Sequence, residues 1–152
     1  MKKLTRSIVS EIEVSYQPKQ GIKQIINSSW DAYEIVKGLI PKRTIALKEY
    51  IVVLYLNQAN RVLGAFKVSD GGITSTVADV RLIFSVALKS VACNFIICHN
   101  HPSGNLKPSK ADILLTEKLR EGGRLLDIKL LDHIIIGPEE GKCLSMADEG
   151  LL

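Results

Sequence analysis

The chain has few cysteines and no apolar segment long enough to span a membrane. Its three cysteines are an odd number without a Cys-x-x-Cys pair, which argues against a disulfide framework or a zinc knuckle and favours a reducing compartment. No apolar run approaches the ~20 residues of a membrane-spanning helix. At the basic amino terminus, Glu11 and Glu13 interrupt the sequence before the apolar core of a signal peptide can form. These absences favour a cytoplasmic protein with no membrane partner.

The chain also lacks the strong positive charge that is typical of nucleic-acid-binding proteins. Its formal charge is +4 over 152 residues, of which 46% are hydrophobic and 24% are charged. Past the amino terminus the densest basic group is Lys42, Arg43 and Lys48, and such short runs usually line a solvated face. The composition therefore predicts an ordinary soluble globular domain, without repeats or low-complexity segments.

Against this background, residues 99–112 contain a compact group of polar side chains. His99 and His101 are one residue apart, so in an extended segment their side chains point the same way. Ser109 and Asp112 are three apart, so in a helix they share a face. Two neutral imidazoles and one carboxylate are a ligand set of catalytic zinc, which keeps a fourth position open for water. A serine hydroxyl beside the ion could hold a polarised carbonyl oxygen.

Each half of this group also has a purely structural explanation. Ser109 followed by Asp112 is the pattern of a capping box at the start of a helix. A pair of histidines on one face of a strand is often incidental. Capping and chemistry are compatible, because a helix N-terminus can fix both a ligand carboxylate and a hydroxyl. The combination of the two patterns favours a hydrolytic metal centre.

The motif resembles that of a known enzyme family. Histidine, any residue, histidine, seven residues, serine, two residues and aspartate is the spacing of the JAMM (MPN+) metalloproteases, and residues 99–112 fit it without a gap. The segments 99–104 and 130–136 look like the RadC branch of that superfamily. The resemblance covers about residues 45–152. It implies a JAB/MPN-like fold, layered like a cytidine deaminase, and Zn²⁺ as the cofactor.

The resemblance further implies a general base. In the family, a glutamate at the head of the first core strand carries protons, and Glu49 occupies that place directly before the apolar run at 50–56. From composition alone, Glu49 is one of 16 acidic residues and an ordinary charge at a strand edge. Its catalytic role is therefore an implication of the resemblance.

Periodicity predicts an α/β fold. Alternation and apolar runs predict strands over residues 8–16, 50–56, 61–68, 94–98, 129–136 and 143–146. Helical spacing and capping residues predict helices from Ser28 or Ser29 to about residue 39, over 76–91 and over 109–122. In the last helix, the residues expected to face the core are Ala111, Leu114, Leu115 and Leu119, and the residues expected to end it are Gly122 and Gly123. The order predicts a single domain with a mixed sheet flanked by helices, in which a strand–helix segment, residues 1–44, packs on a metal domain, residues 45–152.

Four more residues near the motif have a structural interpretation, and two of them, Cys98 and His133, also have a metal-related one. Cys98 precedes His99, but adjacent strand residues point to opposite faces, so packing as a small hydrophobe is favoured over metal ligation. Asn100 and Ser103 are expected to stabilise the turn. His133 is either a buried, hydrogen-bonded histidine or a partner of the metal site.

The sequence thus predicts a zinc-dependent hydrolase of an amide or isopeptide bond, acting on a polypeptide. His99, His101 and Asp112 would hold the metal, Glu49 would act as general base and then acid, and Ser109 would steady the oxyanion. One alternative is a DNA-associated module whose metal site is structural or nucleolytic, which rests on the RadC resemblance. Longer RadC proteins carry a helix-hairpin-helix region, and residues 1–44 show no such pattern, which weakens that alternative. Another is an interaction domain without turnover.

Overall fold

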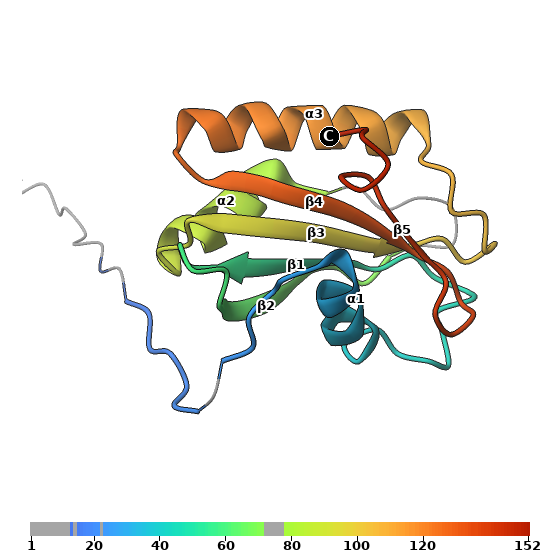
Figure 1. The fold of residues 1–152 in the computed structure, drawn as a ribbon, viewed down its shortest axis with the longest axis horizontal. Coiled ribbons are helices and arrows are strands. Elements are labelled where there is room, and N and C mark those ends of the chain that lie inside the picture. Colours follow the sequence, from blue (N-terminus) through green and yellow to red (C-terminus); the bar gives the residue numbers. More distant parts are fainter. Residues whose placement is uncertain (1–12, 14, 22, 72–77) are drawn as a thin grey trace, which may run out of the picture.

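A computed structural model of the chain describes residue 13 and residues 15–21, 23–71 and 78–152. In chain order its elements are α1 (Ser29–Lys37), β1 (Ile51–Leu56), β2 (Val62–Ser69), α2 (Val80–Lys89), β3 (Asn94–Asn100), α3 (Lys110–Leu125), β4 (Lys129–Ile136) and β5 (Cys143–Ser145). The predicted α/β fold with a mixed sheet is confirmed (Figure 1). No helix in the described part of the chain is both long enough and apolar enough to cross a membrane.

The strands form one sheet in the order β2-β1-β3-β4-β5. β3 and β4 run parallel, and the other neighbouring pairs are antiparallel. Parallel strands need a long crossover, and α3 provides the one between β3 and β4. The carboxyl end of β3 and the amino end of α3 therefore meet at one edge of the sheet.

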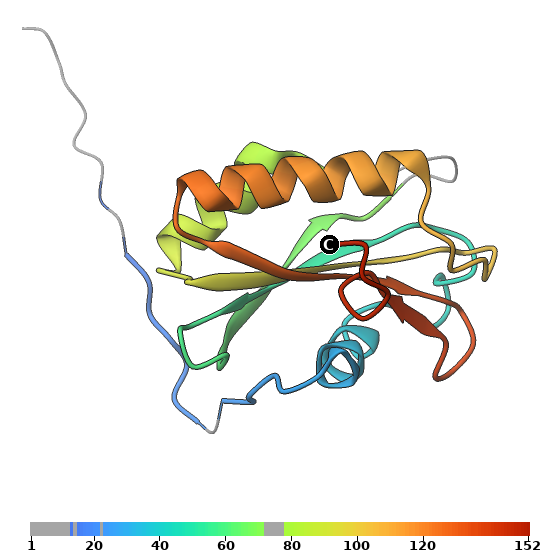
Figure 2. The same ribbon diagram turned by 45° about the horizontal axis from the view of Figure 1, so that its top comes forward.

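Helices cover both faces of the sheet. α1 lies against one face, and α2 and α3 lie against the other (Figure 2). Side chains of a strand alternate between the two cores: Val52 and Cys98 pack on the α1 side, whereas Val53 and Ile97 pack on the side of α2 and α3. Every residue of β1 is buried, which accounts for its continuous apolar run.

Several predicted boundaries differ from the observed ones. β3 extends to Asn100 and so includes His99, whereas the predicted strand ended at residue 98. α1 ends at Lys37, before the predicted residue 39. α2 begins after its cap, Asp79, and ends before residue 91; residues 76 and 77 lie outside the described residues. Most of the predicted strand 8–16 also lies outside them, and Glu13, Ser15 and Tyr16 are not in a strand.

The prediction that two glycines end the last helix is wrong. α3 continues through Gly122 and Gly123 to Leu125. A Cβ at Gly123 would lie 2.2 Å from the carbonyl oxygen of Ile128, and one at Gly122 would lie 2.8 Å from the Phe84 ring. These glycines therefore allow α3 to approach the start of β4 and α2 closely, rather than terminating the helix.

The predicted core face of α3 is also partly wrong. Two of the four expected residues are exposed, Ala111 and Leu114. The buried residues of the helix are Thr116, Leu119 and Gly123. Asp112 begins the same helical face, one turn before Thr116. The face turned to the sheet thus carries polar side chains at its amino end, where the candidate site lies.

β4 contains a bulge near its start. Its register with β3 passes from a Phe95–Leu130 pair to an Ile96–Asp132 pair, so β4 has one extra residue at that point. Because side chains alternate along a strand, the extra residue exchanges the faces of all that follow. Leu130 packs in the core under α3, and His133, three residues later, also contacts α3.

Candidate metal centre

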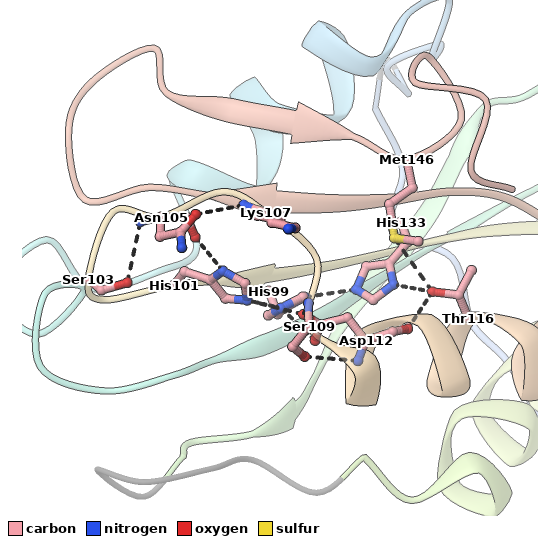
Figure 3. Close-up of polar contacts among 10 residues, drawn as sticks. All are labelled: His99, His101, Ser103, Asn105, Lys107, Ser109, Asp112, Thr116, His133 and Met146. Atoms are coloured by element: carbon pink, nitrogen blue, oxygen red, sulfur yellow. Dashed lines mark hydrogen bonds and ion pairs between the residues drawn. The ribbon is translucent and has the colours of Figure 1, made fainter.

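The three candidate ligands meet where β3 ends and α3 begins (Figure 3). The Nε2 atoms of His99 and His101 are 2.9 Å apart. They lie 3.1 Å and 3.3 Å, respectively, from the two carboxylate oxygens of Asp112. One ligand atom from each residue lies within 4.8 Å of the others. The structure therefore brings together the three residues that the sequence selected.

The loop after β3 fixes the ring of His101. The His101 N–H donates to the carbonyl of Ile136 at 2.9 Å, and the N–H of Gly104 donates to the carbonyl of His101 at 3.0 Å. Gly104 has a φ of 81°, a left-handed conformation that favours glycine. His101 Nδ1 lies 2.6 Å from the carbonyl oxygen of Asn105, which can only accept. The Nδ1 proton is thus held by the loop, and a neutral His101 has its lone pair at Nε2.

α3 begins with a capping box that also orients the Asp112 carboxylate. The Asp112 N–H donates to Ser109 Oγ at 3.1 Å, and the Ser109 N–H donates to Asp112 Oδ2 at 2.7 Å. The structural interpretation of this pair is therefore confirmed. The same contacts turn the carboxylate toward the two histidines, so capping and ligand placement occur together.

The charges of the cluster are strongly coupled. Burial raises the pKa of the Asp112 carboxyl, but hydrogen bonds from the rings of His101 and His99 outweigh it and hold that pKa well below its usual range. The hydrogen bond to Asp112 also raises the pKa of His101 above its ordinary value, against the opposing effect of burial. Asp112 is therefore an anion that attracts a cation to this point.

The donor set fits a metal ion. Imidazole nitrogen and carboxylate oxygen are both ligands of borderline-soft divalent ions such as Zn²⁺. The Nε2 atoms of His99 and His101 lie close to each other and to the Asp112 carboxylate. Neutral His101 has a lone pair at Nε2, and a cation at this point would relieve the repulsion between that lone pair and the carboxylate. Two nitrogens and one oxygen leave a coordination position open, as in a catalytic site.

Glu49 lies beside the cluster, two residues before the start of the neighbouring strand β1. β1 and β3 are antiparallel with Ile51 opposite His99, which brings Glu49, two residues earlier, to the level of His101. The negative charge of Glu49 contributes to the raised pKa of His101. Within the described part of the chain, the group of possible metal ligands at this point contains the two histidines and Asp112 but not Glu49.

Asn100 connects the two histidines to the segment that carries Glu49. The expectation that Asn100 stabilises its own turn is wrong: its fully buried carboxamide contacts the chain that precedes β1. Its NH₂ group donates to the carbonyls of Ile45 and Lys48, each at 2.7 Å. Ser103 has the expected local contact, since its Oγ accepts from the Asn105 N–H at 3.3 Å.

Two further polar residues lie behind His99. His133 is fully buried and hydrogen-bonded, as the first of its two interpretations predicts, and its Nε2 is also 2.7 Å from His99 Nδ1, so it contacts a candidate ligand as well. Burial lowers the pKa of His133 to about 3. Thr116 Oγ1 is 2.6 Å from His133 Nδ1, and sequence reasoning missed it. The only signal for Thr116 in the sequence is its position one helical turn after Asp112.

Cys98 takes no part in the cluster. It is buried among the side chains on the α1 face, opposite to His99. Burial raises the pKa of its thiol, so the thiolate that a metal would need is disfavoured. The prediction that Cys98 packs as a small hydrophobe is confirmed.

Comparison with known proteins identifies a family whose model covers all the candidate site residues. The model of the RadC-like JAB domain matches residues 26–151, a range that includes α1. This match confirms the resemblance inferred from the motif of residues 99–112.

The relatives are longer than this chain. A UPF0758 protein of Flavobacterium johnsoniae is 41% identical over 148 residues, which are 95% of this chain and 62% of that protein. UPF0758 proteins of Methanosarcina mazei and Chlorobaculum parvum are 42% and 39% identical, over 86% and 88% of this chain and 55% and 58% of their own length. The chain thus spans a little over half the length of these relatives.

Proposed function

The chain belongs to the RadC-like JAB domain family, and from that premise we propose that it is a zinc-dependent hydrolase of an amide or isopeptide bond. The observation that carries the proposal is the convergence of His99 Nε2, His101 Nε2 and the Asp112 carboxylate on one point. Two imidazoles and a carboxylate with an open position are typical of hydrolytic zinc sites. The substrate would be a polypeptide or an isopeptide-linked conjugate.

When bound, Zn²⁺ would polarise the substrate carbonyl and lower the pKa of a water molecule toward ~7. Glu49 would accept the proton of the attacking water and pass it to the leaving nitrogen, as the C–O bond forms and the C–N bond breaks. The position of Glu49 at the level of His101, close enough to influence its pKa, supports this role.

Ser109 would stabilise the negative charge that develops on the substrate carbonyl oxygen. Its hydroxyl accepts the Asp112 N–H as the helix cap, which uses only a lone pair. The hydroxyl proton can therefore be donated to the substrate while the cap remains intact.

The first experiment measures metal content. The chain purified without chelator should contain close to one zinc ion per chain, and D112A should lose it because a primary ligand is removed. D70A is the matched control, since Asp70 is an exposed carboxylate in a surface ion pair. Absence of zinc in the purified protein, together with no uptake of added zinc, would contradict the proposal.

The second experiment seeks turnover. Peptide and isopeptide libraries should yield cleaved products that disappear with a chelator and return with zinc. A set of DNA substrates in the same screen tests the alternative of a nucleolytic module. Cleavage of DNA without cleavage of any peptide would replace the proposed reaction class.

A further inference from the structure

We propose that His133 and Thr116 position the ligand His99 by fixing which of its ring nitrogens carries the proton. The inference rests on the proposed metal site and deepens it, because it assigns the support of one ligand to residues outside the motif of residues 99–112. His133 does not belong to the group of possible ligands at this point, and the Thr116 hydroxyl contacts His133 and the backbone carbonyl of Asp112.

His99, His133 and Thr116 form a series of short contacts that leads to Asp112, a second candidate ligand. His99 Nδ1 is 2.7 Å from His133 Nε2, and His133 Nδ1 is 2.6 Å from Thr116 Oγ1 (Figure 3). Thr116 Oγ1 is in turn 2.7 Å from the backbone carbonyl oxygen of Asp112. His133 is fully buried and Thr116 is 3% exposed, so water does not compete for these contacts.

The direction of these hydrogen bonds follows from the last acceptor in the series, the backbone carbonyl of Asp112. A carbonyl oxygen can only accept, so the single proton of the Thr116 hydroxyl is donated to Asp112. Thr116 Oγ1 must then accept from His133 Nδ1. In a neutral imidazole the other nitrogen accepts, so His133 Nε2 receives the proton of His99 Nδ1. The lone pair of His99 is thereby left at Nε2, the atom that faces His101 and Asp112.

The reverse direction is unfavourable at Thr116 and incompatible with metal binding at His99. If Thr116 donated to His133, its oxygen would present a lone pair to the Asp112 carbonyl at 2.7 Å. The proton of His99 would then lie on Nε2 and would block coordination through that atom. The Sδ of Met146, 3.6 Å from Thr116 Oγ1, is a weak acceptor and also favours donation by Thr116.

The fold contains a specific device that brings His133 to this position. Without the extra residue near the start of β4, strict alternation from Leu130 would turn His133 toward the α1 face. The bulge re-aims it toward α3 and His99. Bulges of this kind are often found next to active sites, where they redirect one side chain.

The test compares zinc affinities of paired variants. T116V keeps the shape of the side chain but removes the hydroxyl, whereas T116S keeps the hydroxyl. H133L removes both ring nitrogens, whereas the carboxamide of H133Q can accept from His99 and donate to Thr116. Zinc affinity is measured by competition with a chromophoric chelator, and Co²⁺ absorption spectra report the ligand geometry. Unfolding by urea in the presence of chelator measures the stability of each metal-free variant separately.

We expect T116V and H133L to bind zinc about 10–100-fold more weakly, the range seen when a partner of a metal ligand is removed. T116S and H133Q should recover most of the affinity and the wild-type Co²⁺ spectrum. Unchanged zinc affinity and an unchanged spectrum in a folded T116V would overturn the inference while leaving the proposed function in place. If the conservative variants lose as much affinity as T116V and H133L, the residues act only through packing and the inference is wrong. Failure of the wild-type chain to bind zinc would instead count against the proposed function itself.

Discussion

The carboxamide oxygen of Asn100 accepts the backbone N–H of Tyr50 at 2.7 Å. The NH₂ group of the same side chain donates to the carbonyl of Lys48. Glu49 therefore lies between two backbone groups that one side chain holds, and that side chain belongs to the residue between His99 and His101. Together with the pairing of β1 and β3, this single buried amide thus holds the segment of the candidate base next to the candidate ligands.

Replacing this amide should destabilise the protein strongly. N100A would leave the buried Tyr50 N–H and two partly buried carbonyls without their partner, and a buried group left unsatisfied costs about 1–3 kcal/mol. We expect the free energy of unfolding to fall by at least about 2 kcal/mol in urea denaturation. N27A, at an exposed asparagine, should stay within about 0.5 kcal/mol of the wild type. Equal stability of the two variants would show that the hydrogen bonds of the Asn100 side chain contribute nothing to stability.

Glu49 should be separable from the metal ligands by a conservative change. E49Q keeps the size of the side chain but cannot accept a proton, so zinc content should stay intact while turnover falls by about 10²–10⁴-fold. H99A and D112A should lose zinc and turnover together. E117Q, an exposed change on α3, should alter neither. Loss of zinc in E49Q would identify Glu49 as a ligand, and full activity would place the proton carrier elsewhere.

The two capping boxes offer an internal comparison for Ser109. Ser28 caps α1 with the same contacts that Ser109 makes at α3. S28A and S109A should therefore each lower the free energy of unfolding by about 1 kcal/mol. Only S109A should also reduce kcat, because of the two serines only Ser109 contacts a candidate metal ligand, Asp112. A similar effect of both variants on kcat would remove Ser109 from the reaction.

Zinc affinity should depend on pH through His101. In the metal-free protein the raised pKa of His101 means that its protonated form, paired with Asp112, adds stability below the ordinary pKa of 6.5. This contribution is lost as the pH rises through the raised pKa. Zinc must displace that proton, so its apparent affinity should weaken by about tenfold per unit as the pH falls below the raised pKa. Competition titrations across neutral pH measure the slope, and a flat profile would contradict the assignment.

DNA binding, if present, should be weak and sensitive to salt. With a formal charge of only +4, few phosphate contacts can form, and binding through phosphates weakens steeply as salt rises. We expect no measurable affinity for single-stranded or branched DNA near physiological ionic strength in fluorescence anisotropy. Tight binding that resists salt would favour the DNA-associated alternative.

The candidate ligands could be predicted because local periodicity brings them together. His99 and His101 share a strand direction, and Ser109 and Asp112 share a helix face, so spacing predicts that the members of each pair converge. The continuous apolar run of β1 likewise follows from burial on both faces. Each of these inferences needs only the residues within one element and the loop beside it.

The support behind His99 could not be predicted in this way. The face on which His133 lies depends on the bulge in β4, and no local pattern of that strand signals an extra residue. The buried face of α3 passes through Thr116 rather than Leu114, because the helix is oriented by contacts with elements distant in the sequence. Asn100 was misassigned for the same reason, since its partners precede β1.

The close approach at Gly123 has a mechanical consequence for the metal centre. Gly123 lies on the same face of α3 as Asp112, about 16 Å away along a helix that rises about 1.5 Å per residue. A methyl group at Gly123 would clash with the Ile128 carbonyl and would shift or tilt the carboxyl end of α3. Such a displacement is carried by the helix to its first turn, where it moves Asp112 relative to the two histidines. The alignment of the ligands therefore depends on the packing of Gly123, which is not near any ligand, and zinc occupancy should fall in G123A.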